Sequence, residues 1–369
     1  MTVPFVDLRA ANLELREALD AAYQRVIDSG WYVLGPEVEA FESEFAAYCG
    51  AKNCIGVANG LEAISLILRA HDIGPGDSVI VPANTYIATW LAVTHVGAEV
   101  VPVEPDEGTY NIDPRLVESA IRPNTRAIIA VHLYGQPANM DALSYIAEKH
   151  KLLLLEDAAQ AHGAKHKGQR VGSLSNAAAF SFYPTKNLGA FGDAGAVTTD
   201  DAALADRVRV LGNYGSRKKY VNDLVGFNSR LDELQAALLR VKLSKLDDWN
   251  ERRRKGAEQY RLKLSCLQDF ILPQVQSEVE PVWHLFVVRS RNRDQLQRYL
   301  QAQGVGTHIH YPIPPHVSKA YENLSMPRGS FAITEMLSQE LLSLPISPHL
   351  AKEQVDCVVQ HIRDFLKSQ

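Results

Sequence analysis

The sequence predicts an α/β fold in which helices cover both faces of a mostly parallel, mixed sheet, with a smaller α/β domain at the C-terminus. In the N-terminal part, short runs rich in apolar and β-branched residues alternate with stretches of helical periodicity, as in parallel strands joined by crossover helices. After about residue 235 the chain changes to long charged helices. We therefore predict a large domain over residues 1–240 and a smaller one over residues 241–369, a division that suits a chain of this length.

The composition excludes several classes of function. Hydrophobic residues make up 46% of the chain and charged residues 22%, the balance of an ordinary globular protein. A formal charge of −5 gives no general affinity for nucleic acid. The first residues lack a signal-peptide pattern, and no run approaches the roughly 20 apolar residues of a membrane span. Since the four cysteines have neither zinc-site nor disulfide-scaffold spacing, we expect reduced thiols and a cytoplasmic protein.

Hydrophobic periodicity places the individual elements. It predicts one helix over residues 12–29, another from Val38 to Gly50, and a long charged helix over residues 238–260. The loop over residues 30–36 is apolar and bracketed by glycines, which indicates a packed or interface segment rather than a solvated connector. The predicted strands span residues 54–57, 78–81, 99–103, 125–132, 152–156, 177–182, 196–199 and 283–289.

Asp157 follows the apolar run 151–155, where a buried parallel strand meets the ligand crevice beyond the strand ends. A carboxylate there suits pyridoxal phosphate (PLP), because an anion beside the ring nitrogen favours the protonated pyridine that makes this cofactor an electron sink. On its own, Asp157 fits a helix N-cap at least as well, since small residues follow it. A second residue with matching chemistry is needed to favour the functional interpretation.

Lys186 supplies that second residue. It comes just after another apolar strand, and Pro184 forces a turn that directs the lysine into the same crevice. Burial lowers the pKa of a lysine, and its neutral amine can form an imine with an aldehyde and then act as a general acid or base. A single loop lysine is usually a solvated charge. The pairing with Asp157 at the strand ends of one sheet favours the functional interpretation.

A cofactor phosphate also needs a binding turn. Gly60 and Leu61 follow the first strand and open a helix, so their backbone N–H groups can point at an anion. This pattern is common and is weak evidence alone. Ser181 can add a hydroxyl, and Tyr86 can stack on the pyridine ring, although a core tyrosine is the commoner role for such a residue.

Together these motifs resemble those of the DegT/DnrJ/EryC1/StrS family of sugar aminotransferases, whose fold is aspartate-aminotransferase-like (type I PLP). The likeness extends over nearly the whole chain. Many family members have Thr or Ser where this chain has Leu61, so only a backbone contact with the phosphate is expected from that residue. The segments that carry the resemblance are FVDL at 5–8, NG at 59–60, EDAAQA at 156–161, SFYPTK at 181–186, GFNSRLDELQ at 226–235 and HYP at 310–312.

The resemblance implies roles for individual residues. Lys186 would hold PLP as a Schiff base, Asp157 would pair with the protonated ring nitrogen, and Gln160 would contact the phenolic oxygen. The active unit would be a homodimer with sites at the interface, and the apolar loop 30–36 fits this. The other implied cofactor contacts are Tyr86 on the ring and, around the phosphate, Gly60, Leu61, Ser181 and Asn228 from the neighbouring subunit.

The resemblance also implies an activity. Family members that dehydrate or deoxygenate sugars have histidine in place of the lysine, so Lys186 favours transamination, with glutamate as the implied amino donor in a ping-pong cycle. The segments 213–220 and 306–316 look like those of enzymes that act on dTDP-linked 3-keto-6-deoxyhexoses. Such a substrate would be aminated at C3.

Within these segments Lys219 can neutralise the pyrophosphate, and Tyr183, His310 and Tyr311 can line the hexose. Lys219 fits an ordinary solvated charge as well. The three histidines at 308, 310 and 316 can suggest a metal, but no carboxylate joins them and the prolines between them suit a rigid substrate loop, so we expect no metal. Two alternatives remain: a 4-keto nucleotide-sugar aminotransferase, and a catalytically silent PLP-binding regulatory protein.

Overall fold

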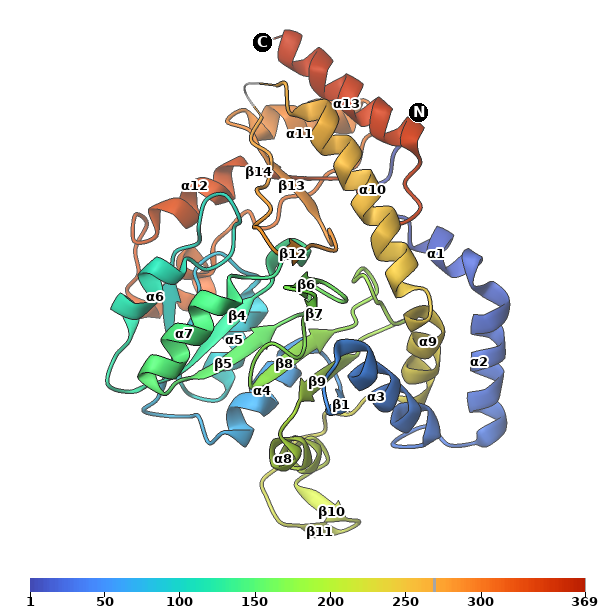
Figure 1. Ribbon diagram of the computed structural model, residues 1–369, viewed down its shortest axis with the longest axis vertical. Coiled ribbons are helices and arrows are strands. Elements are labelled where there is room, and N and C mark those ends of the chain that lie inside the picture. The colour runs from blue at the N-terminus through green and yellow to red at the C-terminus, as the bar shows by residue number, and fades with distance from the viewer. Residues whose placement is uncertain (268–269, 369) are drawn as a thin grey trace.

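The computed structural model describes residues 1–267 and 270–368. A seven-stranded sheet with the strand order β1-β9-β8-β5-β4-β2-β3 lies at its centre (Figure 1). The strand β9 (Gly195–Thr199) is antiparallel to both neighbours, while the other adjacent pairs are parallel, which confirms the predicted mixed sheet. Its other strands are β1 (Asn53–Val57), β2 (Ser78–Pro82), β3 (Glu99–Val103), β4 (Thr125–Val131), β5 (Leu153–Asp157) and β8 (Ala177–Ser181).

Helices cover both faces of this sheet. Successive side chains of a strand point to opposite faces, and in β5 Leu154 and Leu155 accordingly belong to two separate hydrophobic clusters. Burial on both faces explains why the strands are continuous apolar runs in the sequence. One face packs against α4 (Gly60–Ala70), α5 (Ile87–His95) and α8 (Ala202–Gly212), and the other against α3 (Pro36–Cys49), α6 (Pro114–Ala120) and α7 (Met140–His150).

Two predicted helices are each divided in the structure. The segment 12–29 belongs to α1 (Leu8–Glu14) and α2 (Arg16–Ser29), which are separated at Leu15 (φ −113°, ψ 15°). Leu15 is buried in a cluster with Leu19, Leu238 and Trp249, so tertiary packing outweighs helical periodicity at this position. The segment 238–260 is likewise divided between α9 (Glu233–Leu243) and α10 (Leu246–Leu264).

The C-terminal part has its own core, built on the antiparallel pair β13 (Phe286–Arg289) and β14 (Leu341–Leu344). The N-terminal residue Val3 joins this core, because its N–H donates to Gly304 (2.9 Å) and its carbonyl accepts from Gly306 (2.8 Å). The domain division at residue 240 stays a prediction. The helices of this part are α10, α11 (Arg293–Ala302), α12 (Ala332–Glu340), α13 (Lys352–Lys367) and the 3-10 turns η2 (Pro315–Val317) and η3 (Lys319–Leu324).

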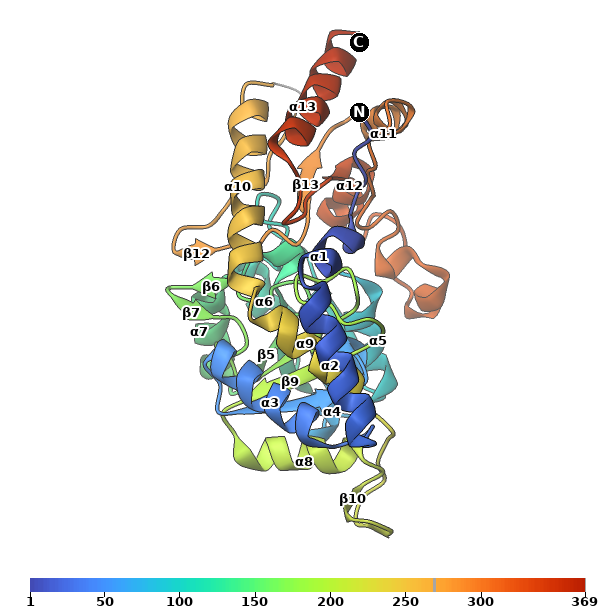
Figure 2. The same cartoon turned by 90° about the vertical axis from the view of Figure 1, so that its right-hand side faces the viewer.

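Shorter elements surround the central sheet. The hairpin β10 (Ser216–Lys218) and β11 (Val221–Asn222) extends beyond α8 at one end of the molecule (Figures 1 and 2). None of the helices in the described ranges is long and apolar enough to cross a bilayer. The remaining elements are β6 (Lys165–His166), β7 (Gln169–Arg170), β12 (Val279–Glu280) and the 3-10 turn η1 (Leu133–Gly135).

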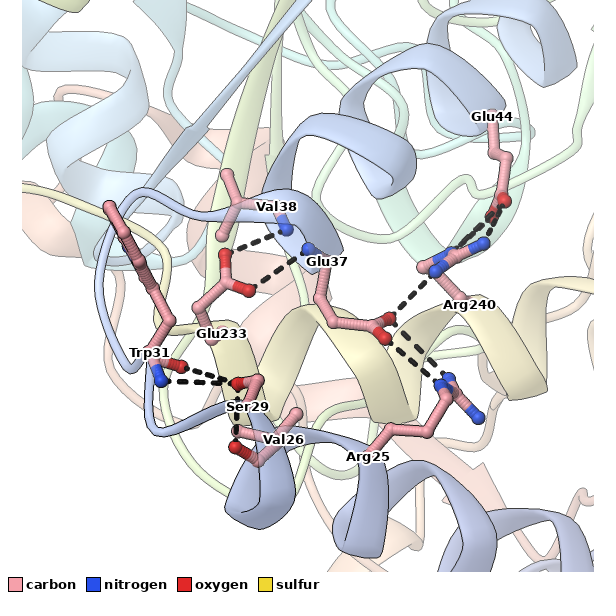
Figure 3. Close-up of polar contacts among 9 residues, drawn as sticks. All are labelled: Arg25, Val26, Ser29, Trp31, Glu37, Val38, Glu44, Glu233 and Arg240. Atoms are coloured by element: carbon pink, nitrogen blue, oxygen red, sulfur yellow. Dashed lines mark hydrogen bonds and ion pairs between the residues drawn. The ribbon is translucent and has the colours of Figure 1, made fainter.

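The apolar loop between α2 and α3 is held by one buried carboxylate. Glu233, 1% exposed at the start of α9, accepts hydrogen bonds from the backbone N–H groups of Gly35 (2.7 Å), Glu37 (2.9 Å) and Val38 (3.0 Å), as Figure 3 shows for the last two. The carboxylate therefore caps the N-terminus of α3, where it also complements the helix dipole. Trp31 remains 58% exposed on the same loop.

We expect Glu233→Gln to lower the free energy of unfolding by about 2 kcal/mol, because a neutral amide has one acceptor oxygen for three buried N–H donors. Urea unfolding of the purified variant measures this loss. Glu258→Gln is the control, since Glu258 is solvent-exposed and, within residues 1–267 and 270–368, its one ion pair is with Arg261 at 3.4 Å; it should change stability by less than about 0.5 kcal/mol. Equal stability of the two variants would contradict the capping role of Glu233.

Candidate active site

Asp157 is presented at the carboxyl end of β5. It is 7% exposed, and its Oδ2 accepts a hydrogen bond from the Thr89 hydroxyl (2.8 Å) while its Oδ1 accepts one from the Ala159 N–H (3.2 Å). The backbone is fixed as well, because the Asp157 carbonyl accepts from His132 N–H (3.1 Å). Turns rather than a helix follow Asp157 in the structure. Asp157 therefore does not cap a helix.

Lys186 lies on the turn that Pro184 predicts, with its N–H bonded to the Tyr183 carbonyl (2.8 Å). Its side chain is half-buried. Burial lowers the pKa of Lys186 to about 8, and the negative charge of Asp157 opposes this shift. A substantial fraction of this amine is therefore neutral near pH 7.5, whereas an ordinary lysine is almost fully protonated there.

Three histidines feel the charge of Lys186: His162 and His284, which are buried, and His310, which is half-buried. Burial is the main cause that lowers the pKa of His162 to about 3 and that of His310 to about 4, and it places the pKa of His284 well below its usual value. The positive charge of Lys186 lowers all three further. These imidazoles are therefore neutral at physiological pH, and Asp157 is the carboxylate that acts on the charge of the lysine.

Asn187 anchors the loop that carries Lys186. Its Nδ2 donates to Asn250 Oδ1 (2.9 Å) and to the Val282 carbonyl (3.0 Å), and its Oδ1 lies 3.2 Å from His284 Nδ1. Since both amide hydrogens are used, Oδ1 is the acceptor and His284 Nδ1 carries the proton. Asn187 and His284 were not predicted from the sequence; the available signal was that a polar residue, Asn187, directly follows the candidate lysine.

Gln160 and Tyr311 close another side of the site. Gln160 Oε1 accepts from the Tyr134 N–H (2.7 Å), and Gln160 Nε2 donates to the Tyr311 hydroxyl (3.0 Å), which leaves one amide hydrogen for a ligand. Burial raises the pKa of Tyr311, so its hydroxyl stays protonated. The Tyr86 ring lies 5.2 Å from the Tyr311 ring and is 52% exposed, with surface available for stacking.

The predicted phosphate turn is present at the start of α4. Asn59 caps this helix by accepting from the Glu62 N–H (2.9 Å), and the N–H groups of Gly60 and Leu61 lie in the first turn, where no intrahelical acceptor is available. Gly60 is required here, because a Cβ would lie 2.7 Å from the Ser181 Cβ. The close approach packs Ser181 against the start of α4, and the free N–H groups of this turn suit an anion.

Two of the proposed sugar-binding residues, His310 and Tyr311, lie beside Gln160. His310 Nδ1 lies 2.8 Å from the Ser343 hydroxyl, and the His310 carbonyl accepts from the Tyr134 hydroxyl, which brings residues 310–311 beside Gln160. His316 is not part of this group, because it lies on η2 with its Nε2 3.1 Å from Glu335 of α12. Tyr183, on the Lys186 turn, is half-exposed.

Lys219 and Asn228 lie outside this group of residues. Lys219 is on the projecting β10–β11 hairpin, with its ammonium 5.2 Å from the Tyr220 ring. The Asn228 side chain is exposed, and the next residue, Ser229, accepts from the Ala58 N–H (3.2 Å). In the described part of the chain, neither side chain has a hydrogen bond or ion pair with Lys186 or Asp157.

The residues at the strand ends fit PLP. They comprise an amine of lowered pKa, a buried oriented carboxylate, a backbone turn with an adjacent hydroxyl for a phosphate, and an exposed aromatic ring. The Gly60–Ser181 approach, which a Cβ would obstruct, is the local feature that makes the turn fit an anion. This set supports amine chemistry on an aldehyde cofactor.

Comparisons with known proteins agree with this chemistry. Residues 14–363 match the model of the DegT/DnrJ/EryC1/StrS aminotransferase family. The chain is 57% identical over 363 residues to the "Erythromycin biosynthesis sensory transduction protein EryC1" of Saccharopolyspora erythraea, covering 98% of this chain and 99% of the relative. It is 55% identical over 364 residues to the "dTDP-3-amino-3,6-dideoxy-alpha-D-galactopyranose transaminase" of Aneurinibacillus thermoaerophilus, with coverage of 98% and 99%.

Solved structures show the same fold. The DesV protein of S. venezuelae, solved with a ketimine intermediate, superposes with a TM-score of 0.98 at 54% identity and covers 99% of this chain and 98% of its own. The NtdA protein of Bacillus subtilis, solved with bound cofactor PMP, has a TM-score of 0.93 at 31% identity, with coverage of 99% and 85%. The chain therefore belongs to the DegT/DnrJ/EryC1/StrS aminotransferase family, and its cofactor is pyridoxal phosphate.

Proposed function

We propose that the protein transfers an amino group from glutamate to C3 of a dTDP-linked 3-keto-6-deoxyhexose, giving a 3-amino-3,6-dideoxyhexose. The observation that carries the transaminase chemistry is the half-buried Lys186, with its pKa lowered to about 8, beside the buried carboxylate of Asp157. The substrate is supported by the transaminase of A. thermoaerophilus, whose name specifies a dTDP-3-amino-3,6-dideoxyhexose and whose sequence is 55% identical.

Each group at the strand ends has a role in this proposal. PLP, when bound, supplies the aldehyde and the electron sink. Lys186 would hold the cofactor through its amine and, when that amine is free and neutral, would move protons. Asp157 holds a proton on the ring nitrogen, and the free amide hydrogen of Gln160 is directed at the phenolic oxygen. The remaining contacts are Tyr86 against the ring and Gly60, Leu61 and Ser181 around the phosphate.

Tyr183, His310 and Tyr311 are the proposed hexose contacts. His310 is neutral, since burial lowers its pKa to about 4, so it can accept or donate a hydrogen bond to a sugar hydroxyl without adding charge. The ammonium of Lys219 is proposed to neutralise the pyrophosphate. Because its hairpin extends beyond α8 at one end of the molecule (Figure 1), Lys219 is proposed to serve a partner subunit.

A homodimer is supported by the exposed apolar surface. The loop held by Glu233 exposes Trp31 and Tyr32 by more than half, and contiguous apolar surface of this kind marks an interface. Asn228 is exposed beside the phosphate turn and is proposed to reach the phosphate in the partner. Other exposed large apolar residues are Leu13, Tyr23, Ile27, Val33, Leu34, Phe191, Tyr214, Val221, Leu224 and Val225.

Two alternatives are kept. Amination at C4 uses the same cofactor groups, and only the pose of the hexose distinguishes it from amination at C3. A regulatory protein that binds PLP without turnover is suggested by the name of the S. erythraea relative, a sensory transduction protein. The intact set of Lys186, Asp157 and the phosphate turn favours turnover.

The lowered pKa of Lys186 predicts a pH dependence. Only the neutral amine attacks an aldehyde, so PLP capture by cofactor-free protein should accelerate with rising pH around a midpoint near 8, below the 10.5 of an ordinary lysine. Asp157→Asn should move this midpoint lower, because the carboxylate stabilises the ammonium. The visible absorption band and its loss on borohydride treatment measure capture. A reducible band in Lys186→Ala, or a midpoint near 10.5, would contradict the assignment.

The substrate proposal predicts a difference between two isomers. With glutamate as donor, we expect the dTDP-linked 3-keto-6-deoxyhexose to be aminated and the 4-keto isomer to react at least about tenfold more slowly, a difference of 1.4 kcal/mol in activation free energy. NMR of the purified product identifies the aminated carbon. Turnover of the 4-keto isomer alone favours the first alternative, and a PLP band without turnover of either isomer favours the regulatory one.

The shared site predicts complementation between inactive variants. Lys186→Ala and Asn228→Ala should each be inactive or strongly impaired as homodimers, whereas hybrid dimers contain one intact site made from both chains. Random mixing of equal amounts makes half of the dimers hybrids with one intact site in two, so about one quarter of wild-type activity should return. Light scattering checks the dimer. Activity no greater than that of the separate variants would show that Asn228 acts within its own chain.

A further inference from the structure

A pair of buried threonines adjoins Asp157. Thr85 and Thr89 are 3% and 1% exposed, and their hydroxyl oxygens lie 3.0 Å apart. The Thr89 hydroxyl in turn donates to Asp157 Oδ2 at 2.8 Å. The two threonines flank Tyr86, the proposed stacking residue, at the start of α5. One short segment therefore carries Tyr86 and also contacts Asp157, two of the residues expected around the cofactor ring.

The direction of this hydrogen-bond chain is fixed by the number of hydrogens. A carboxylate only accepts, so the single hydroxyl hydrogen of Thr89 is directed at Asp157. Thr89 must then accept from Thr85, which makes Thr85 the donor of the 3.0 Å bond. Successive hydroxyl donors polarise one another, and in a buried site such a bond to a carboxylate is strong.

Besides the Thr89 hydroxyl, a backbone N–H also binds the Asp157 carboxylate. The Ala159 N–H holds Oδ1 at 3.2 Å, so among the described residues only this long bond would fix the carboxylate without Thr89. Thr89 therefore sets the rotation of the carboxylate.

We propose that Thr89, supported by Thr85, is a positioning residue that keeps the Asp157 carboxylate aimed at the ring nitrogen of the cofactor. The inference rests on the proposed pairing of Asp157 with that nitrogen. Without the Thr89 hydroxyl, the carboxylate can turn away from the ring nitrogen, which would then hold its proton less firmly. A less positive ring lets the nitrogen of the Lys186 Schiff base keep its proton to higher pH, because the repulsion between the two positive charges is reduced.

The test compares variants that differ by one group. Thr89→Val replaces the hydroxyl by a methyl of similar size, and Thr89→Ser restores the hydroxyl without the methyl. Thr198→Val is the control for loss of a buried threonine hydroxyl, since Thr198 donates to the Gly172 carbonyl at 2.7 Å in the central sheet. The readouts are the Kd of PLP for cofactor-free protein and the pH midpoint of the visible band.

We expect Thr89→Val to weaken PLP binding roughly tenfold, the loss of one hydrogen bond to a charged group, and to move the pH midpoint of the band upward. Thr89→Ser should restore both values, and Thr198→Val should change neither. Wild-type values in Thr89→Val, or an equal loss in Thr198→Val, would overturn the proposal.

A double-mutant cycle separates this inference from the proposed site. If Thr89 acts through Asp157, Thr89→Val should have almost no further effect on the Kd of PLP in an Asp157→Asn background. Additive effects would overturn the positioning role while leaving the pairing of Asp157 intact. Wild-type PLP affinity and band titration in Asp157→Asn alone would instead overturn that pairing, and the inference with it.

Discussion

Two adjacent buried carboxylates at the end of β5, Glu156 and Asp157, are the constraint on which the site depends. Strand alternation directs them to opposite faces of the sheet, and each needs partners because an unpartnered buried charge is costly. Glu156 accepts from His132 Nε2 (3.0 Å), the N–H groups of Gly172 (2.9 Å) and Leu174 (3.0 Å), and the Ser175 hydroxyl (3.1 Å). It joins the end of β4 and a connecting loop to β5, and so fixes the backbone from which Asp157 extends.

The electrostatic character of the site follows from the charge states of the groups around Lys186. The histidines near Lys186 are neutral, so the attraction between Lys186 and Asp157 is opposed mainly by loss of hydration. Removal of hydration favours the uncharged amine, and the carboxylate restrains that effect. The balance leaves the amine nucleophilic near neutral pH while retaining an anion for the ring nitrogen.

The strands and the strand-end residues were predictable because each has a local signal. Buried parallel strands are continuous apolar runs, and a charged residue within a few positions of the end of such a run, as Asp157 and Lys186 are, is expected in the crevice. Thr89, Asn187 and His284 had no comparable signal, because their roles arise from contacts with residues distant in the sequence. The helix break at Leu15 was missed for the same reason, since packing against α9 and α10 decides it.

Local sequence patterns also could not predict where Lys219 and Asn228 lie relative to the Lys186 site. Both are exposed on the segment that includes the β10–β11 hairpin, and their proposed roles require a second copy of the chain. A resemblance in sequence can suggest such roles, whereas the geometry of one chain can only show that these side chains remain available. The regiochemistry of amination has no single-residue signal, because it depends on the pose of the whole sugar.

The anchoring of Asn187 has a consequence for protein engineering. Its three side-chain bonds reach Asn250 on α10 and the segment that carries Val282 and His284, so the loop of Lys186 is attached to parts of the chain that a swap of C-terminal segments would replace. A chimera that joins this N-terminal part to another protein's substrate-selecting segment must retain a matching amide acceptor, carbonyl and imidazole. Without these three partners, the chimera would lose the contacts that hold the Lys186 amine in position.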